Sequence, residues 1–205
     1  MPPAFLYFDL GKVLIDFSLD RMLAQAATAS GVAVELMRPA IFGNGLLQRY
    51  ERGQVSSREF FEEFCAAANC RPDADRLAAA VSEIFTLNLP VLPIVAQLRQ
   101  AGYRMGILSN TCEVHWEYCA EHYNILTEAF DVHALSYRIG AVKPDEAIFR
   151  AAAEMAGHRP EEIFFVDDLA GHVAGARAFG FDAVQFTAAA TLAADLRRRG
   201  LRFNY

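Results

Sequence analysis

The sequence lacks the features that cross-link a small protein or hold it in a membrane. Only four of its 205 residues are cysteines, and no two of them have CxxC spacing. Its best apolar stretch, residues 84–98, is interrupted by an asparagine and two prolines, so no segment approaches the ~20 apolar residues that span a bilayer. The basic start and cleavage site of a signal peptide are also missing. We therefore expect a cytoplasmic protein with free thiols.

The sequence also lacks an excess of positive charge. It has 19 lysines and arginines against 25 aspartates and glutamates, a net charge of −6. Proteins that coat nucleic acids or bind membrane surfaces use a basic face, so neither partner is expected. With 54% hydrophobic and 21% charged residues, the chain is too apolar to be disordered. Its length fits a core domain with a smaller lobe and leaves the oligomeric state open.

Short apolar runs alternate with helical patterns along most of the chain. Four runs predict buried parallel strands, at residues 5–8, 104–108, 163–166 and 183–186. Helical patterns separate the later runs. This alternation predicts an α/β fold with a doubly wound, Rossmann-like parallel sheet.

Residues 18–88 break this alternation. They contain no strand-like run but several amphipathic patterns, one of which begins with a capping box formed by Ser56 and Glu59. We therefore predict a small all-helical cap inserted after the first strand. The expected core domain comprises residues 1–17 and 89–205, and the expected cap domain comprises residues 18–88.

Polar side chains follow the predicted strands at the point where each strand ends. Asp9 follows the first strand, Ser109 and Asn110 follow the second, and the adjacent carboxylates Asp167 and Asp168 follow a later one. The carboxyl ends of parallel strands meet at one edge of the sheet, where open α/β folds bind their ligands. We therefore expect these side chains to line one crevice.

Each motif has an ordinary structural explanation when it is taken alone. Asp9 is a turn former, Ser109 begins a Ser-Asn-Thr turn, and Lys143 before Pro144 marks the start of a helix. The combination points to chemistry, because three carboxylates in one crevice cannot all ionise without a cation, and oxygen ligands suit Mg²⁺. A lysine and a hydroxyl beside that cation predict a phosphate site in which an aspartate can act as a nucleophile.

Four motifs resemble those of the haloacid dehalogenase superfamily, and they occur in the family's order. They read FDLGKVL, ILSNT, VKPD and FFVDD. The chain is similar to the subgroup with a small helical cap after the first strand, and the segments YERGQVS and SYRIGAVKPDEAIF resemble one branch of sugar-phosphate phosphatases. The resemblance covers essentially the whole chain. It implies a Mg²⁺-dependent phosphatase that acts on a small phosphorylated metabolite, with a hexose 1-phosphate favoured.

The resemblance also implies a role for each residue of the motifs. Asp9 is the expected nucleophile that becomes an aspartyl-phosphate, and it is also a ligand of Mg²⁺. Gly11 is expected to offer its backbone carbonyl to the metal, Asp168 to bind it directly and Asp167 to bind it through a water. Lys143 is expected to neutralise the phosphoryl group and to hold the carboxylate of Asp9.

Further residues are expected to contact the phosphoryl group or the rest of the substrate. The Ser109 hydroxyl and the backbone N–H of Asn110 are the expected donors to phosphoryl oxygens. In the cap, Tyr50 and Glu51 are candidates for contact with the substrate.

One position departs from the family pattern. The usual phosphatase has a second aspartate two residues after the nucleophile, and that aspartate protonates the leaving group. Gly11 stands there instead, so an acid–base group worth roughly 10²–10⁴ in rate is missing. A water, the substrate or a cap residue could supply the proton, with Glu51 and His115 as candidates. The alternative is that the backbone needs a glycine with a positive φ at this position.

Two other functions remain open at this point. A metal-independent dehalogenase-type hydrolase would use the same aspartate nucleophile, but its last motif would not keep the acidic pair Asp167 and Asp168. A catalytically weak or inactive protein with a binding or regulatory role is the second alternative, because Gly11 removes the usual acid–base group.

Overall fold

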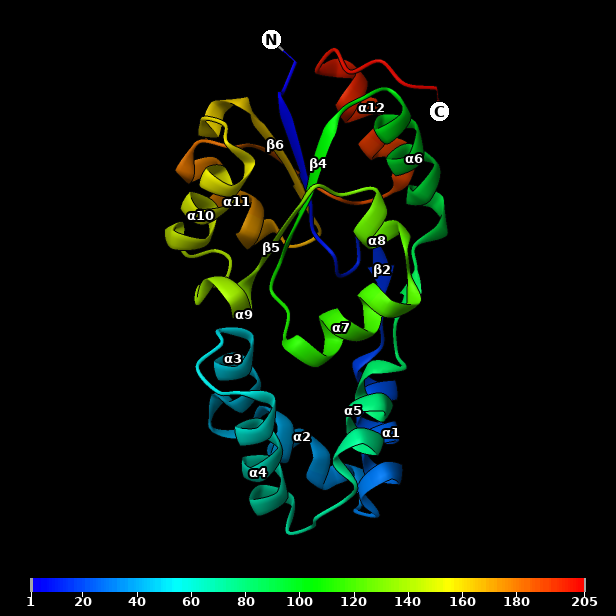
Figure 1. The fold of residues 1–205 in the computed structure, drawn as a ribbon, viewed down its shortest axis with the longest axis vertical. Coiled ribbons are helices and arrows are strands. Elements are labelled where there is room, and N and C mark those ends of the chain that lie inside the picture. Colours follow the sequence, from blue (N-terminus) through cyan, green and yellow to red (C-terminus); the bar gives the residue numbers. More distant parts are fainter. Residues whose placement is uncertain (1, 205) are drawn as a thin grey trace.

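The computed structural model describes residues 2–204. At its centre lies a five-stranded parallel sheet with the strand order β5-β4-β1-β6-β7. Its strands are β1 (Phe5–Phe8), β4 (Arg104–Ser109), β5 (Val132–Leu135), β6 (Ile163–Asp167) and β7 (Asp182–Gln185). Helices flank both faces of the sheet (Figure 1). The predicted doubly wound α/β fold is therefore confirmed.

The flanking helices follow the strands in the order expected for this fold. One face is covered by α10 (Glu146–Ala156) and α11 (Ala170–Phe179), and the other by α6 (Leu92–Gln100) and α12 (Ala189–Arg198) (Figure 1). Three more helices lie between β4 and the loop that precedes α10: α7 (Glu113–His122), α8 (Ile125–Glu128) and α9 (Ser136–Ile139). Short 3₁₀ turns complete the set: η1 (Gly43–Gly45), η2 (Leu89–Val91) and η3 (Pro160–Glu162).

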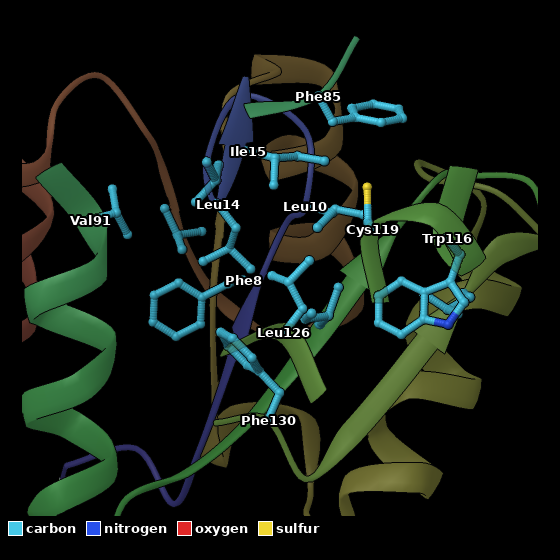
Figure 2. Packing of buried hydrophobic residues seen from close by; sticks show 14 of the residues in the cluster. Phe8, Leu10, Leu14, Ile15, Phe85, Val91, Trp116, Cys119, Leu126 and Phe130 are labelled. Carbon is cyan, nitrogen blue, oxygen red and sulfur yellow. The ribbon is translucent and has the colours of Figure 1, made fainter. Parts of the chain in front are cut away.

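The central strand β1 explains why helices must cover both faces. Its four side chains are at most 1% exposed. Phe5 and Tyr7 pack with the side chains of α10 and α11, whereas Leu6 and Phe8 pack with those of α6 and α12. A strand that is buried on both faces has a continuous apolar sequence, and successive side chains point to opposite faces. Figure 2 shows Phe8 within the second of these clusters.

Between β1 and β4 the chain forms a group of five helices, which we call the helical insertion: α1 (Leu19–Ser30), α2 (Val34–Phe42), α3 (Leu46–Glu51), α4 (Ser57–Ala68) and α5 (Ala74–Ser82). The group lies beyond the carboxyl ends of the sheet strands (Figure 1). Two short antiparallel strands, β2 (Ile15–Asp16) and β3 (Thr86–Leu87), connect it to the core. The division into two domains at residues 18 and 88 stays a prediction.

The helices predicted within residues 18–88 are present, and one of them begins where the sequence indicated. The capping box at the start of α4 is present, because the Ser56 hydroxyl accepts from the Glu59 N–H and the Glu59 carboxylate accepts from the Ser56 N–H. The expectation that residues 18–88 contain no strand is wrong, since β3 lies there. A two-residue strand is too short to show a periodic pattern. Strand β5 was also not predicted, because it is an edge strand whose Val132 and His133 are only half-buried.

Other sequence-based expectations concern cysteines and membranes. All four cysteines are free. The longest helices of residues 2–204 are α1 and α4, with 12 residues each, and none of the helices there has the length and apolarity to cross a bilayer.

Gly106 allows β4 to lie close to the aromatic side chains of β1. A Cβ at this position would lie 2.5 Å from Cε1 of Tyr7 and 2.9 Å from Cε1 of Phe5. Both rings are fully buried in a close-packed core and have little room to move. We predict that Gly106→Ala lowers the free energy of unfolding by about 1–3 kcal/mol, measured by urea denaturation.

The matched control for this prediction is Gly171→Ala in α11, where a Cβ meets nothing within 4 Å. This variant is expected to raise stability by up to about 1 kcal/mol, because alanine favours a helix more than glycine does. Equal effects of the two substitutions would contradict the prediction.

Candidate active site

The carboxyl ends of three neighbouring strands bring the predicted motifs together. Asp9 directly follows β1, Ser109 is the last residue of β4, and Asp167 is the last residue of β6. β4 and β6 pair with opposite edges of β1, so the strands that follow β1 in the sequence extend the sheet first to one side of it and then to the other. Such reversals open the crevice in which α/β folds bind ligands. The expected convergence of these side chains is therefore present.

Lys143 lies between two of these carboxylates. Its ammonium group is fully buried and lies 2.8 Å from Oδ1 of Asp9 and 2.6 Å from Oδ2 of Asp167, and it donates to the Leu108 carbonyl at 3.0 Å. These acceptors match the three N–H donors of an ammonium group. Burial lowers the pKa of Lys143, but the two carboxylates outweigh burial and the net shift is upward. The lysine therefore stays charged in the interior.

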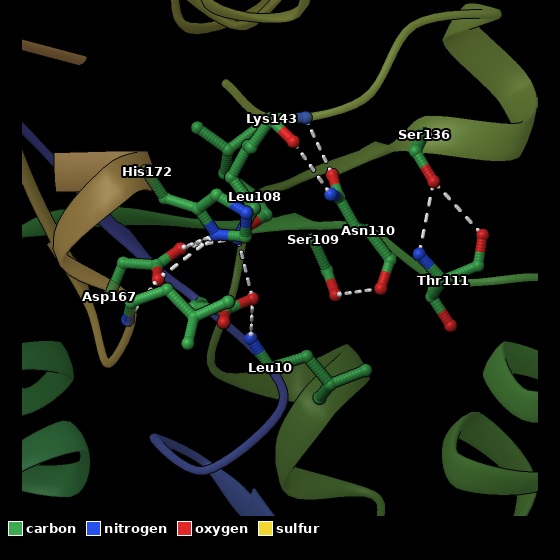
Figure 3. Close-up of polar contacts among 11 residues, drawn as sticks. Leu10, Leu108, Ser109, Asn110, Thr111, Ser136, Lys143, Asp167 and His172 are labelled. Carbon is green, nitrogen blue, oxygen red and sulfur yellow. Dashed lines mark hydrogen bonds and ion pairs between the residues drawn. The ribbon is translucent and has the colours of Figure 1, made fainter. Parts of the chain in front are cut away.

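The side chain of Asn110 holds the backbone of Lys143 in place (Figure 3). Its Nδ2 donates to the Lys143 carbonyl at 3.0 Å, and its Oδ1 accepts from the Lys143 N–H at 2.7 Å. In the same region, Ser136 accepts from the Thr111 N–H and donates to the Thr111 carbonyl, both at 3.0 Å. Asn110 was expected to act only through its backbone N–H, and the role of Ser136 was not predicted. Both contacts join segments far apart in the chain, so no local pattern reveals them.

Asp9, Asp167 and Asp168 form an acidic cluster. One carboxylate oxygen from each residue lies within 4.8 Å of the other two. Burial raises the pKa of Asp9 to about 6, and burial followed by the charge of Asp167 raises the pKa of Asp168. Burial is the main cause of both upward shifts, and the charge of the neighbouring Asp167 adds to them.

The donor set of the acidic cluster fits Mg²⁺. Carboxylate oxygens are the hard donors that this ion prefers. Three ionised aspartates against the single charge of Lys143 leave two negative charges unbalanced, which is the charge that a divalent cation neutralises. The residues that could hold the ion are therefore those that the sequence analysis named.

His172 and Leu169 orient Asp167 within the cluster. The Leu169 N–H donates to Oδ1 of Asp167 at 2.8 Å, and Nδ1 of His172 lies 3.1 Å from both carboxylate oxygens (Figure 3). Although burial favours the neutral acid, the contacts from His172 and Lys143 outweigh it and lower the pKa of Asp167. His172 thus holds the Asp167 carboxylate from the first turn of α11.

A hollow of about 100 Å³, which we call the catalytic hollow, lies between the sheet and the helical insertion. The residues that line it include Gly11, Ser109, Asn110, His115, Leu47 and Glu51. The expected phosphate donors therefore face the same space as a carboxylate from the insertion. The site therefore combines hydrogen-bond donors with an acidic cluster that can hold a cation.

Glu51 is the last residue of α3 and is half-buried. Burial raises the pKa of its carboxyl to about 7, an effect that His172 and Lys143 partly offset. Directly after it, Arg52 forms an ion pair with Asp145 at 2.8 Å, which ties the end of α3 to the start of α10. The core therefore holds Glu51 over the catalytic hollow.

The other two candidates outside the motifs differ from Glu51. His115 lines the catalytic hollow, but burial lowers the pKa of its imidazole to about 4, so the ring is neutral at pH 7. Tyr50 is buried away from the hollow, where its hydroxyl lies 2.7 Å from the Ser57 hydroxyl and accepts from the Val114 N–H at 3.4 Å. Neighbouring residues of α3 therefore face different spaces.

Gly11 does not have a positive φ, so the conformational explanation for this glycine is wrong. The positive φ belongs to the next residue, Lys12, at 60°. The space around Gly11 is limited instead by Phe17, whose Cε1 would lie 3.0 Å from a Cβ at this position. A larger side chain at position 11 therefore requires a small movement of one half-buried ring.

Comparison with known proteins identifies the family. The model of the haloacid dehalogenase-like hydrolase family matches residues 6–180, most of the chain. The chain belongs to this family. The hydrolase is 26% identical over 186 residues to the D-ribitol-5-phosphate phosphatase of Bacteroides thetaiotaomicron, in an alignment that covers 87% of this chain and 89% of that enzyme. The resemblance seen in the four motifs is thereby confirmed.

Solved structures agree with this assignment at the level of the fold. A haloacid dehalogenase family enzyme from Bacteroides thetaiotaomicron, crystallised with magnesium and inorganic phosphate, has a TM-score of 0.81 at 24% identity and covers 91% of the hydrolase and 95% of its own chain. The L-2-haloacid dehalogenase from Xanthobacter autotrophicus has a TM-score of 0.64 at 21% identity, with coverages of 96% and 83%. The hydrolase fold is therefore more similar to the first of these two.

Lys143 is the buried partner of two carboxylates, so its removal leaves them unpaired. We predict that Lys143→Met lowers the free energy of unfolding of the hydrolase at pH 7, without added metal, by about 3–5 kcal/mol. The loss shrinks at pH 5, because carboxyls without a cationic partner take up protons more readily. Urea denaturation at the two pH values measures both effects.

The matched control is Lys12→Met. The Lys12 ammonium lies 3.5 Å from the Asp16 carboxylate, and the two side chains are 42% and 54% exposed. An exposed ion pair contributes less than about 1 kcal/mol. Equal losses for the two lysine variants, or a Lys143→Met loss that does not change with pH, would contradict the interpretation.

Proposed function

We propose that this hydrolase is a Mg²⁺-dependent phosphatase that acts on a small phosphorylated metabolite. The observation that supports this best is the buried ion-paired group of Asp9, Lys143 and Asp167, which lies beside Asp168 and the phosphate donors of the catalytic hollow. Phosphoryl transfer depends mainly on positioning and charge neutralisation, and this group supplies both. The similarity to D-ribitol-5-phosphate phosphatase supports a small phosphorylated substrate.

Asp9 is the proposed nucleophile. Oδ1 of Asp9 accepts from the Leu10 N–H at 2.7 Å and pairs with Lys143, so we assign the attack to Oδ2. The bond between Oδ2 and phosphorus forms while the bond from phosphorus to the leaving oxygen breaks, and that oxygen takes up a proton. Water then attacks the phosphorus, which releases inorganic phosphate and restores the Asp9 carboxylate.

The remaining motif residues bind and neutralise the phosphoryl group. We assign the Ser109 hydroxyl and the Asn110 N–H as donors to its oxygens, and Lys143 as its positive partner. Asp9, Asp168 and the carbonyl of Gly11 are the proposed direct ligands of Mg²⁺, and Asp167 is proposed to bind the ion through a water. When bound, the ion would offset the negative charge of the phosphoryl group.

Glu51 is the proposed acid that replaces the aspartate missing at Gly11. Both residues line the catalytic hollow, and the raised pKa of Glu51 keeps its proton available near neutral pH. In this role Glu51 protonates the leaving oxygen and then accepts a proton from the attacking water. His115 cannot act as the acid at pH 7, because burial keeps its imidazole neutral.

The alternatives explain fewer of these observations. A metal-independent dehalogenase has no use for the acidic cluster with its unbalanced charge. An inactive binding protein has no need for a buried lysine that pairs with Asp9, because burying a charge away from water is unfavourable.

We also propose that residues 18–88 form a cap that determines which substrate reaches the catalytic hollow.

Removal of the nucleophile tests the phosphatase proposal. We predict that Asp9→Asn lowers kcat to below about 10⁻³ of the wild-type value, and that EDTA abolishes wild-type activity until Mg²⁺ is restored. Phosphate release from a panel of phosphorylated metabolites and p-nitrophenyl phosphate measures both effects. The control Asp16→Asn, at an exposed aspartate, is expected to keep its activity. Undiminished turnover in Asp9→Asn or in EDTA would rule the proposal out.

The proposed acid predicts a dependence on pH and on the leaving group. For an alkyl phosphate, wild-type kcat/KM falls as the pH rises above about 7, because Glu51 must carry a proton. Glu51→Gln is expected to lose roughly 10²–10⁴ in kcat/KM for this substrate, together with that pH dependence. An aryl phosphate loses less, because a phenoxide leaves without a proton.

Two further variants sharpen this test. Glu35→Gln changes an exposed glutamate of α2 and is expected to have no effect. Gly11→Asp in the Glu51→Gln background is expected to restore part of the alkyl phosphate activity, provided that the Phe17 ring moves by a few tenths of an ångström. Equal losses on alkyl and aryl phosphates in Glu51→Gln would assign that residue a role in binding or folding instead.

A further inference from the structure

A second cavity lies inside the helical insertion, and we call it the apolar chamber. It has a volume of about 310 Å³, against about 100 Å³ for the catalytic hollow. Its lining is mainly aliphatic and aromatic, with side chains from α1, α2, α3, α4, α5 and α7 that include Met22, Ile41, Leu47, Phe60, Phe64 and Leu77. Its size and lining match those of cavities that bind small apolar ligands.

A cavity of this kind is unusual unless something binds in it. Protein interiors are close-packed and contain few voids larger than a water molecule. Water also gains little in the apolar chamber, because an ordered water needs several polar partners. Two polar groups of the lining, the hydroxyls of Tyr50 and Ser57, already contact each other at 2.7 Å. An apolar group is therefore the occupant that fits the lining.

The apolar chamber adjoins the catalytic hollow. Met22, Leu47 and His115 line both spaces. Leu47 lies one helical turn before Glu51 on α3, and residues four apart share a helix face. A ligand with its phosphate in the catalytic hollow would therefore need to pass only these three side chains to reach the apolar chamber.

Two charged residues, Arg58 and Asp75, also line the apolar chamber. Arg58 and Asp75 are both exposed, so the apolar chamber reaches the solvent near the first turns of α4 and α5. A sugar would require partners for several hydroxyl groups deep in the lining, and burying a hydroxyl without a partner is unfavourable. An alkyl chain or an aromatic ring has no such requirement.

We propose that the apolar chamber binds the leaving group of the substrate, and that the substrate is a phosphomonoester of an apolar alcohol. This inference rests on the proposed phosphatase function and replaces the sugar phosphate that the sequence resemblance favours. The phosphate binds at the acidic cluster, and the alkyl or aryl group lies between α1, α4 and α5. Met22 and Leu47 form the passage between the two spaces.

Binding of unreactive analogues tests the proposal without turnover. Alkylphosphonates from methyl to octyl are titrated into the wild-type protein with Mg²⁺ by calorimetry. Each methylene buried in the apolar chamber is expected to tighten binding by about fourfold. The kcat/KM values of the matching alkyl phosphates are expected to rise with chain length in the same order, and to exceed those of hexose phosphates.

Two variants of one helix locate the binding site of the alkyl chain. Ala78 of α5 lines the apolar chamber, whereas its neighbour Ala79 is exposed and lies outside the lining. Ala78→Phe is expected to reduce the affinity ratio of octyl to methyl phosphonate by at least about tenfold, since its ring occupies the space of several methylenes. Ala79→Phe is expected to leave that ratio unchanged. Thermal unfolding of both variants verifies that they fold.

The outcomes separate this proposal from the phosphatase assignment. An affinity that does not depend on chain length, an equal effect of the two alanine variants, or octylphosphonate binding that saturating methylphosphonate does not displace would each overturn the apolar substrate. Mg²⁺-dependent hydrolysis that persists in any of these cases leaves the phosphatase assignment intact. Conversely, chain-length-dependent binding without hydrolysis of any phosphate would support the apolar chamber and overturn the phosphatase.

Discussion

The buried ammonium of Lys143, held between Asp9 and Asp167, is the interaction on which the site depends. It joins the loop before α10 to the ends of β1 and β6, and the Leu108 carbonyl at the end of β4 completes its contacts. Such a charge is tolerated in the interior only because every donor has an acceptor. Its single positive charge does not offset all three carboxylates of the acidic cluster. One lysine thus organises the crevice but leaves negative charge for a further cation to balance.

Much of this arrangement could be predicted from the sequence, because the relevant signals are local. The buried run of β1 and the polar residues at the strand ends identify the sheet edge where the motifs meet. The contacts that fix the geometry could not be predicted. The clamp of Asn110 on the Lys143 backbone spans 33 positions in the chain, and the edge strand β5 gains its place only by pairing with β4. Both depend on tertiary structure.

The helical insertion shows the same limit more clearly. Tyr50 and Glu51 are adjacent in the sequence and were proposed together as substrate contacts, but they line different spaces. Which residue faces the catalytic hollow depends on how α3 docks, through Arg52 on Asp145 and the close approach of Gly53 to the Tyr137 carbonyl. The apolar chamber also has no sequence signature, because its lining consists of the same residue types that fill a core.

The position of the proposed acid links substrate recognition to chemistry. In the usual family pattern the acid follows the nucleophile by two residues and belongs to the core, whereas here Gly11 stands at that position and the proposed acid belongs to α3. Leu47 and Glu51 share one face of this helix, so the wall of the apolar chamber and the proton donor belong to the same rigid element. In the proposed mechanism, a leaving group that packs against Leu47 would place its oxygen near Glu51. The binding energy of the apolar group would then orient proton transfer and is expected to raise the rate for substrates that fill the chamber.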